Sequence, residues 1–169
     1  EMLADTDWLL ENLDKPNIRI VDCDPPDSFF RAHIPNSVNI GSNTFVKSAN
    51  SSLHVMDAEE IEEFMSNLGI SSDTTVICYD GRNSLTATRF WWVLNYYGHT
   101  NAKVLNGGWI KWISESKPVS IVPTKVDKTK FVAEKDDSLI ADHNRVLAAI
   151  NSDSDIIWDA RTIEEYNGQ

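Results

Sequence analysis

The chain has 169 residues, of which 41% are hydrophobic and 24% charged, a composition typical of one globular domain with some length to spare. Its formal net charge of -11 argues against nucleic acid and anionic membranes as partners, because both would repel it. No apolar run is long enough to span a bilayer, and no signal peptide is visible.

The first forty residues predict a helix followed by two short strands. In the segment TDWLLENL, Thr6 or Asp7 is the expected N-cap, and Trp8, Leu9 and Leu13 are the expected inward positions. Short β-branched runs bounded by turn residues are typical of buried strands. Two such strands are expected, at 18–23 and 37–40.

A loop rich in serine and asparagine, from Gly41 to about Ser52, precedes a clearly signalled helix. Asp57 opens this helix, and Glu60 follows at the spacing of a capping box. Gly69 ends the helix at a position where glycine is favoured. An apolar stripe on this helix is expected to be core; it consists of Ile61, Phe64, Met65 and Leu68.

The next fifty residues continue the alternation of strands and helices. A β-branched strand at 74–79 leads into a small polar loop and a helix that ends at Gly98. A further strand at 102–106 is followed by a tight glycine turn and a short helix. This alternation predicts an α/β fold, with a parallel sheet covered by helices on both faces.

The chain is expected to divide into three parts. Residues 1–118 form one compact α/β domain, and two prolines with mixed charge make 119–140 an extended connection. In the last part, 141–169, the pattern again predicts regular structure. Asp142 is the expected N-cap of a helix, and a strand is expected at 155–160.

This last part repeats the beginning of the chain. The segment NIRIVDCDPPDSFF aligns with SDIIWDARTIEEYN at a constant offset of 137, which places Asp22 on Asp159. A lone helix and strand cannot bury a core. We therefore expect residues 141–169 to be the opening helix and strand of a second copy of the domain in a longer protein.

Four segments, in order along the chain, resemble the rhodanese family, in particular its tandem-domain thiosulfate and 3-mercaptopyruvate sulfurtransferases. The family pattern G-H-I-P-G-S-V-N-I is matched with Ala32 and Asn36 in place of glycines. The resemblance implies a rhodanese-like fold with residues 1–118 as the inactive first domain of a tandem. The four segments are VDCDPPDSFFRAHIPNSVNI, YDGRNSLTATRFWWVLNYYGH, VLNGGWIKW and DARTIEEYNG.

The resemblance also implies a mechanism. In the family, a cysteine in the loop after the central strand of the second domain takes up sulfur as a persulfide and passes it to cyanide or a thiol. Here the corresponding loop of the first domain begins with Asp80, and a carboxylate cannot form a persulfide. The first domain is therefore predicted to be inactive, with the catalytic cysteine beyond residue 169. Neither a cofactor nor a metal is implied.

The same resemblance names the expected partners and supporting residues. The partners are a small anionic sulfur donor, a thiol or cyanide acceptor, and the second rhodanese-like domain. Asp159 and Arg161 would not contact the substrate themselves but would hold in place the residues that line its pocket. Glu165 stands before Tyr166, where mercaptopyruvate-type members tend to carry arginine, and this favours thiosulfate as the donor.

Only two cysteines offer another nucleophile. Cys78 lies inside an apolar strand, where burial raises the pKa of a thiol, and Cys23 ends the first strand, where partial access is conceivable. Neither forms a Cys/His cluster, so no structural zinc is expected. Two unpaired thiols fit a reducing compartment, which predicts the cytoplasm, or the mitochondrion in a eukaryote. Arg82 is either an anion clamp or a solvated loop residue, and Arg89 is expected to have a structural role.

Other readings of the chain stay open. A non-catalytic rhodanese-like binding or regulatory module is the main alternative, and a phosphatase on the same loop would also need a loop cysteine. A hydrolase is unsupported because no histidine has a nucleophile elbow nearby, and His33 is interpreted as structural. The aromatic residues at 90–97 are more than one helix face can bury, so some of them are expected to face the second domain. Burial of both Trp92 and Tyr96 within the first domain would contradict this expectation.

Overall fold

The computed structural model describes residues 1–41 and 55–169 and divides into two compact units, Glu1–Asp136 and Asp137–Gln169. Beyond Gly41, the loop expected up to Ser52 lies outside the described residues. Among the described residues, none of the helices combines the length and the apolar character needed to cross a membrane.

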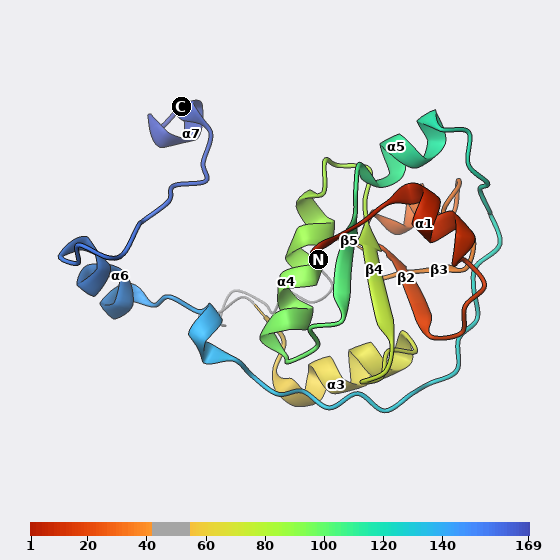
Figure 1. The fold of residues 1–169 in the computed structure, drawn as a ribbon, viewed down its shortest axis with the longest axis horizontal. Coiled ribbons are helices and arrows are strands. Elements are labelled where there is room, and N and C mark those ends of the chain that lie inside the picture. Colours follow the sequence, from red (N-terminus) through yellow and green to blue (C-terminus); the bar gives the residue numbers. More distant parts are fainter. Residues whose placement is uncertain (42–54) are drawn as a thin grey trace. The chain divides into compact units, whose positions relative to one another are not determined.

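The first unit is built on a parallel sheet of five strands in the order β1-β5-β4-β2-β3 (Figure 1). This confirms the predicted α/β fold with a parallel sheet. The strand β4 lies at the centre, and the carboxyl ends of all five strands share one edge of the sheet. The strands are β1 (Leu3–Ala4), β2 (Ile18–Asp22), β3 (Ser37–Asn39), β4 (Thr75–Tyr79) and β5 (Ala102–Leu105).

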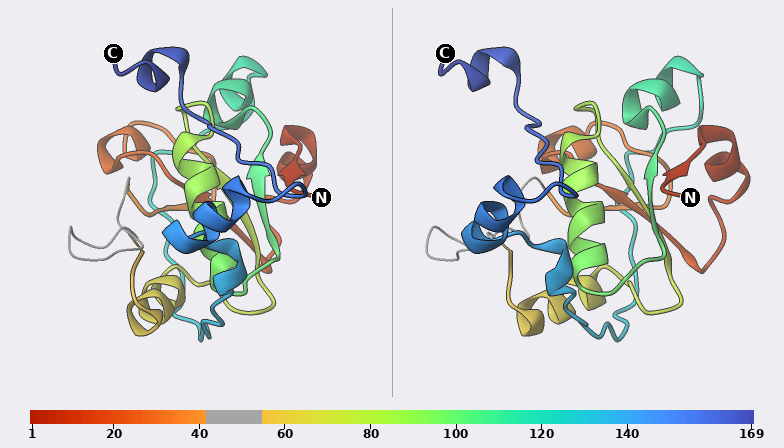
Figure 2. Two further views of the ribbon diagram at one scale, coloured as in Figure 1. Left: turned by 90° about the vertical axis from the view of Figure 1, so that its left-hand side faces the viewer. Right: turned by 60° about the vertical axis from the view of Figure 1, so that its left-hand side comes forward.

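Helices cover both faces of this sheet, as the alternating pattern predicted. The helices α3 and α4 lie on one side, and α1 and α5 lie on the other (Figures 1 and 2). The second unit contains one 3-10 turn and two short helices. The helices are α1 (Thr6–Glu11), α2 (Pro26–Phe29), α3 (Ala58–Asn67), α4 (Leu85–Tyr96), α5 (Gly108–Ser114), η1 (Asp137–Leu139), α6 (His143–Ile150) and α7 (Ile163–Tyr166).

Side-chain alternation along β4 divides the core into two layers. Ile77 and Tyr79 belong to the cluster that also contains Leu9 of α1 and Trp112 of α5, and all four are fully buried. Cys78, which lies between Ile77 and Tyr79, points to the opposite face, toward α4, because successive side chains of a strand alternate. It is fully buried as well.

The N-terminal segment differs from the prediction in two respects. The N-cap of α1 is Asp5 rather than Thr6 or Asp7, and Trp8 stays 39% exposed whereas Leu9 is buried. The strand β1 was not predicted, because two residues carry no periodicity. It forms because Leu3–Ala4 pairs with the free edge of β5. The helix α3 follows the prediction, with a capping box and a glycine at its end.

Residues 119–136 contain no helix; they are the last part of the first unit and pack against the rest of it as a strap. Phe131 is only 4% exposed, and its N–H donates to Ser66 Oγ at 3.0 Å. The N–H of Thr129 donates to the carbonyl of Ser66 at 3.0 Å, and the N–H of Asp136 to that of Tyr96 at 2.8 Å. The division at residue 118 remains a prediction, while the compact unit itself runs to Asp136.

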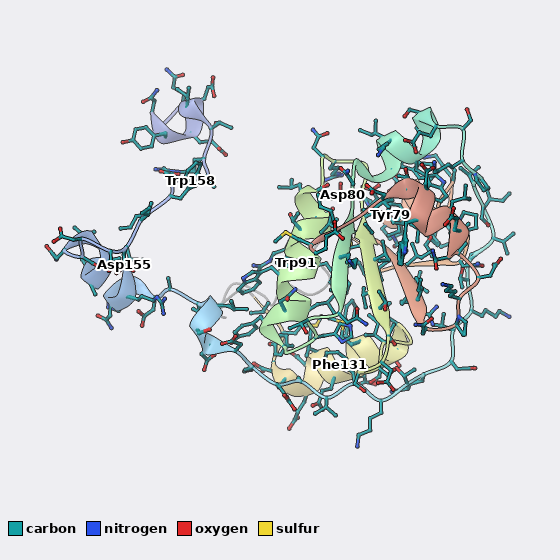
Figure 3. All side chains as sticks on the ribbon, viewed as in Figure 1. Tyr79, Asp80, Trp91, Phe131, Asp155 and Trp158 are labelled. Atoms are coloured by element: carbon teal, nitrogen blue, oxygen red, sulfur yellow. The ribbon has the colours of Figure 1, made fainter. Side chains whose placement is uncertain are left out.

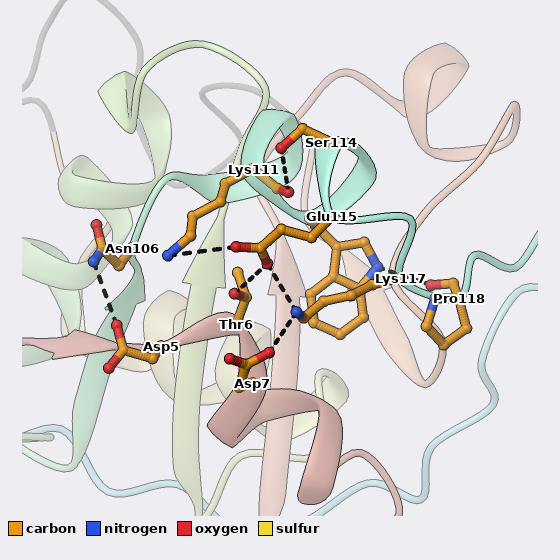
Figure 4. A network of polar contacts seen from close by, with 10 residues as sticks. Asp5, Thr6, Asp7, Asn106, Lys111, Ser114, Glu115, Lys117 and Pro118 are labelled. Atoms are coloured by element: carbon orange, nitrogen blue, oxygen red, sulfur yellow. Dashed lines mark hydrogen bonds and ion pairs between the residues drawn. The ribbon is translucent and has the colours of Figure 1, made fainter.

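A network of polar contacts joins α5 to α1 where the chain leaves α5 (Figure 4). Lys117 Nζ lies 2.6 Å from Asp7 Oδ1 and 2.8 Å from Glu115 Oε2, and its side chain is only 8% exposed. Thr6 donates its hydroxyl to the same Glu115 oxygen at 2.6 Å. The ammonium also lies 6.0 Å from the ring centre of Trp112. The start of the strap is thereby fixed against the first helix.

The second unit is only partly as predicted. Asp142 is the N-cap of α6, and its side chain accepts a hydrogen bond from the N–H of Arg145 at 2.9 Å. The strand expected at 155–160 is wrong, because these residues form no strand. A strand needs a hydrogen-bonding neighbour, and residues 137–169 contain none. Trp158 is consequently 84% exposed (Figure 3).

Candidate functional site

The candidate site lies where β2 and β4 end side by side. These two strands are parallel neighbours, and Asp22 stands opposite Tyr79 in their register. Beyond the strands come Asp24 and Asp80, both less than 9% exposed. Asp80 lies at the end of β4, next to Tyr79 (Figure 3). The carboxyl ends of parallel strands are the usual place for ligand sites in α/β sheets.

The carboxylate of Asp80 accepts five hydrogen bonds from the loop that follows it. Oδ1 accepts from the N–H groups of Arg82 and Ser84, each at 2.8 Å. Oδ2 accepts from the N–H groups of Thr86 and Ala87 and from the Thr86 hydroxyl, again at 2.8 Å each. The side chain is only 2% exposed. The loop is therefore a backbone nest that is filled by an anion belonging to the chain itself.

Local backbone geometry explains why the loop curls around this carboxylate. Asn83 and Ser84 both have positive φ, at 56° and 66°, which turns successive N–H groups inward. The N–H groups of Thr86 and Ala87 belong to the first turn of α4, where no carbonyl of the helix can accept them. The positive end of the helix dipole adds to the attraction for a negative charge.

The start of α5 closes over the same loop. The N–H of Trp109 donates to the backbone carbonyl of Asp80 at 2.9 Å. Gly108, with φ +53°, lies so close to this carbonyl that a Cβ atom would collide with its oxygen. Gly108, the second glycine of the predicted turn, therefore also sets the distance between α5 and the Asp80 loop.

Asp22 belongs to a second, buried network. Its Oδ2 accepts the Tyr79 hydroxyl proton at 2.6 Å, and its Oδ1 accepts from the N–H of Asp24 at 2.8 Å. The Tyr79 oxygen in turn accepts from the N–H of Ile34 at 3.1 Å and lies 3.2 Å from Ser37 Oγ. Burial raises the pKa of Asp22 to about 6, against the opposing effect of these hydrogen bonds.

This raised pKa predicts a pH-dependent stability. Between about pH 4 and about pH 6 folded Asp22 keeps a proton that the unfolded chain has lost, so its contribution to the free energy of unfolding falls as pH rises. Replacing Asp22 by Asn removes this titration. As pH rises from about 4 to about 7, the unfolding free energy of the variant should therefore increase relative to that of wild type by on the order of 3 kcal/mol. Urea denaturation at several pH values measures the difference.

The matched control is Asp73→Asn, at an exposed turn position. It should leave the pH dependence of the unfolding free energy unchanged. Equal pH slopes for wild type and Asp22→Asn would contradict the assignment of the slope to Asp22.

Asp24 completes the site and was not recognised from the sequence. Its Oδ2 accepts from the N–H of Gly81 at 2.8 Å, which ties the end of β2 to the Asp80 loop. The spacing Asp-Cys-Asp was the available signal, because alternate residues of a strand face the same side. A pocket of about 320 Å³ opens here; it is lined by Asp22, Asp24, Ser28, Arg31, Ala32, Gly81, Arg82 and Trp109.

Neither cysteine reaches this pocket. Cys23, for which partial access was considered, is fully buried, and that expectation is wrong. The reason is the alternation along β2, which turns Cys23 toward the α4 side while Asp22 and Asp24 point to the pocket side. Cys78 is also fully buried, and burial raises the pKa of both thiols. Within the described residues, no group of three His, Cys, Asp or Glu side chains could hold a metal ion.

The remaining candidates have separate positions. Arg82 is exposed and lines the pocket. Arg89 is half-buried, and its guanidinium lies 4.9 Å from the ring centre of Trp92. His33 is buried, with Nδ1 2.8 Å from the carbonyl of Phe29, in keeping with a structural role. Its Nε2 lies 3.1 Å from the carbonyl of Val122 and thus contacts the strap.

In the second unit, Asp159 and Arg161 pair with each other. Arg161 Nη2 lies 2.6 Å from Asp159 Oδ2, and both side chains are exposed. This ion pair lowers the pKa of Asp159. The arginine also lies over the ring of Tyr166, 5.4 Å from its centre. Their expected support of a substrate pocket remains a prediction.

The aromatic residues of α4 are divided between core and surface. Tyr96 is only 1% exposed, and Trp92 stacks on it at 5.3 Å while remaining half-buried. Trp91 donates its indole N–H to the carbonyl of Ala102 at 3.0 Å. Since Trp92 is not buried, the expectation that part of this cluster faces a second domain remains a prediction.

The fold and the site together define an α/β domain whose central parallel strand ends in an anion-binding loop. Here the bound anion is the buried carboxylate of Asp80. Residues 5–115 match the family model described as the rhodanese-like domain. The chain belongs to the rhodanese-like domain family.

Several named proteins are similar to this chain. The sulfur carrier protein TtuD of Thermus thermophilus is 31% identical over the whole chain, and thiosulfate sulfurtransferase of Cricetulus griseus is 37% identical over 63% of it, matching 36% of that protein. The crystal structure of Escherichia coli SseA, described as a 3-mercaptopyruvate sulfotransferase, matches with a TM-score of 0.86 at 25% identity, over 98% of this chain and 67% of SseA. The chain spans 61% of the length of TtuD and of mycobacterial relatives.

Proposed function

We propose that this chain is the non-catalytic first domain, with the beginning of the second, of a tandem-domain sulfurtransferase. The observation that carries the proposal is the Asp80 carboxylate in its nest of five donors. In the family, this loop of the catalytic domain holds the anionic thiolate. A carboxylate satisfies the same donors permanently, and it has no sulfur to accept or transfer.

The proposed reaction takes place at a cysteine of the second domain, beyond residue 169. Its thiolate would attack the outer sulfur of thiosulfate, so that a new S–S bond forms and sulfite leaves with the electron pair of the broken bond. The persulfide would then pass its outer sulfur to cyanide or a thiol. The names of the similar proteins support thiosulfate or 3-mercaptopyruvate as the donor. A reducing compartment, such as the cytoplasm, suits two unpaired buried thiols.

In the same proposal, the domain division is 1–118, 119–140 and 141–169, and the exposed part of α4 faces the second domain. Three exposed apolar residues support the proposal that 141–169 belong to a larger domain, because Ile156, Trp158 and Ile163 are each more than 75% exposed. Side chains of this kind are normally covered in a complete domain.

A sulfur-uptake experiment tests the proposal. The 169-residue chain is incubated with thiosulfate, and its intact mass is measured before and after. No gain of sulfur is expected, because both cysteines are buried and burial raises the pKa of their thiols. A gained sulfur that maps to Cys23 or Cys78 would overturn the assignment of this domain as non-catalytic.

The variant Asp80→Cys is the informative counterpart. It places a thiol among the same donors, which favour the thiolate. It should gain one sulfur from thiosulfate if the shape of the nest suffices for persulfide formation. A correctly folded Asp80→Cys that gains none would show that other loop residues have diverged as well.

A further inference from the structure

The pocket beside the Asp80 loop has a charge pattern that the proposed sulfur chemistry does not use. Asp22 and Asp24 line it as carboxyl groups, and Arg31 and Arg82 line it as guanidinium groups. The formal charges of the four groups cancel, although the chain as a whole carries -11. Trp109 adds an aromatic wall. A volume of about 320 Å³ is within the range of small-molecule sites.

The acidic side of the pocket has one oxygen available. Asp24 is only 8% exposed, and its Oδ2 is held by the N–H of Gly81. In the part of the chain that the structure describes, its Oδ1 accepts no hydrogen bond. This oxygen is therefore open to the pocket, and an ammonium group of a ligand would supply it with both a donor and a positive charge.

The two arginines that line the pocket, Arg31 and Arg82, also have donors available for a ligand. Neither Arg31 nor Arg82 forms an ion pair within residues 1–41 and 55–169, although Arg31 donates to Ser28 Oγ at 3.1 Å. Arg82 lies near enough to Asp24 to lower the pKa of that carboxyl, opposing the effect of burial. Guanidinium groups recognise carboxylates in particular, because their donors match the two oxygens.

We propose that this pocket binds a small zwitterion, an amino acid or a similar molecule, with its ammonium group at Asp24 and its carboxylate at Arg82. A free inorganic anion would meet the carboxylates of Asp22 and Asp24, and a simple amine would leave the guanidinium groups without a partner. The charge pattern therefore excludes both in favour of a molecule with two opposite ends. Trp109 lines the same pocket, and its ring and Asp24 Oδ2 both lie within 4 Å of where a Cβ atom on Gly81 would stand. An aromatic ring near that carboxylate is a favourable contact for an ammonium group.

The probes are glycine, β-alanine and γ-aminobutyrate, which separate the two charges by increasing distances. They are added to the 169-residue chain, uniformly labelled with nitrogen-15, and the amide signal of Gly81 and the indole signal of Trp109 are followed by NMR. At least one probe should shift both signals saturably. The matched amine and carboxylate, such as propylamine and propionate for β-alanine, should not.

Two variants locate the site. Asp24→Asn retains an oxygen for the Gly81 N–H, and Arg82→Gln changes an exposed side chain, so both should fold. Each should weaken binding of the best probe at least about tenfold. Arg145→Gln, at an exposed arginine of α6, is the control that should leave the affinity unchanged.

Three results would overturn the proposal. They are the absence of a saturable shift with all three amino acids, an equal response to the amine alone, and unchanged affinity in both site variants. Because none of the probes donates sulfur, a negative result here leaves the proposed sulfurtransferase role untouched. Sulfur uptake at Cys23 or Cys78 would likewise leave the pocket untouched.

Discussion

Replacing Asp80 by alanine should lower the free energy of unfolding of the first unit by about 3–5 kcal/mol. The substitution removes one acceptor that serves five donors, four of them backbone N–H groups. The donors of Thr86 and Ala87 are buried, so water cannot easily replace the carboxylate there. Urea denaturation followed by tryptophan fluorescence measures the loss.

Two companion variants show whether the nest is the cause. Asp80→Asn keeps one acceptor oxygen but turns an NH₂ group toward other donors, so an intermediate loss is expected. Asp73→Ala removes a carboxylate at an exposed turn and should change the unfolding free energy by less than about 0.5 kcal/mol. If Asp80→Ala were no less stable than Asp73→Ala, the five hydrogen bonds would not stabilise the fold as argued.

Gly108→Ala should destabilise the first unit by about 3 kcal/mol, because two costs combine. The residue has φ +53°, which L-residues rarely adopt, and its new Cβ would collide with the carbonyl oxygen of Asp80. That oxygen is backbone and also accepts from the N–H of Trp109, so it cannot move aside alone. The same denaturation experiment measures the effect.

A second substitution separates the two costs. Asparagine tolerates positive φ better than alanine but carries the same Cβ. If the collision dominates, Gly108→Asn should be as unstable as Gly108→Ala, whereas a much milder Gly108→Asn would assign the cost to φ alone. Gly168→Ala has φ +76° with open space around the Cβ, so it should show only a small local effect.

The sequence allowed the central part of the fold to be predicted because strong local signals and tertiary structure agree there. The strands β2 and β4 are short β-branched runs, and α3 has a capping box and a terminal glycine. The two-residue strand β1 carries no such signal and exists only through pairing with β5. The opposite error occurs at 155–160, where the pattern of a strand is present but no neighbouring strand is.

The candidate site was predictable in place but not in detail. Asp80 could be located because it follows the best strand of the chain. The resemblance to the family implies a loop of N–H groups that a carboxylate can occupy, but it does not say which five donors bind Asp80, because these depend on two non-glycine residues with positive φ, Asn83 and Ser84. The link between Asp22 and Tyr79 depends on the register of two strands that are 57 positions apart in the sequence. Periodicity fixes which face a residue occupies, but it does not fix such a register.

The strap has a consequence for where the folded unit ends. Its residues carry the buried Phe131 and the hydrogen bonds to Ser66 and Tyr96, so they belong to the first compact unit, which runs to Asp136. A chain shortened to residue 118 would lose these contacts and would expose the surface that Phe131 covers.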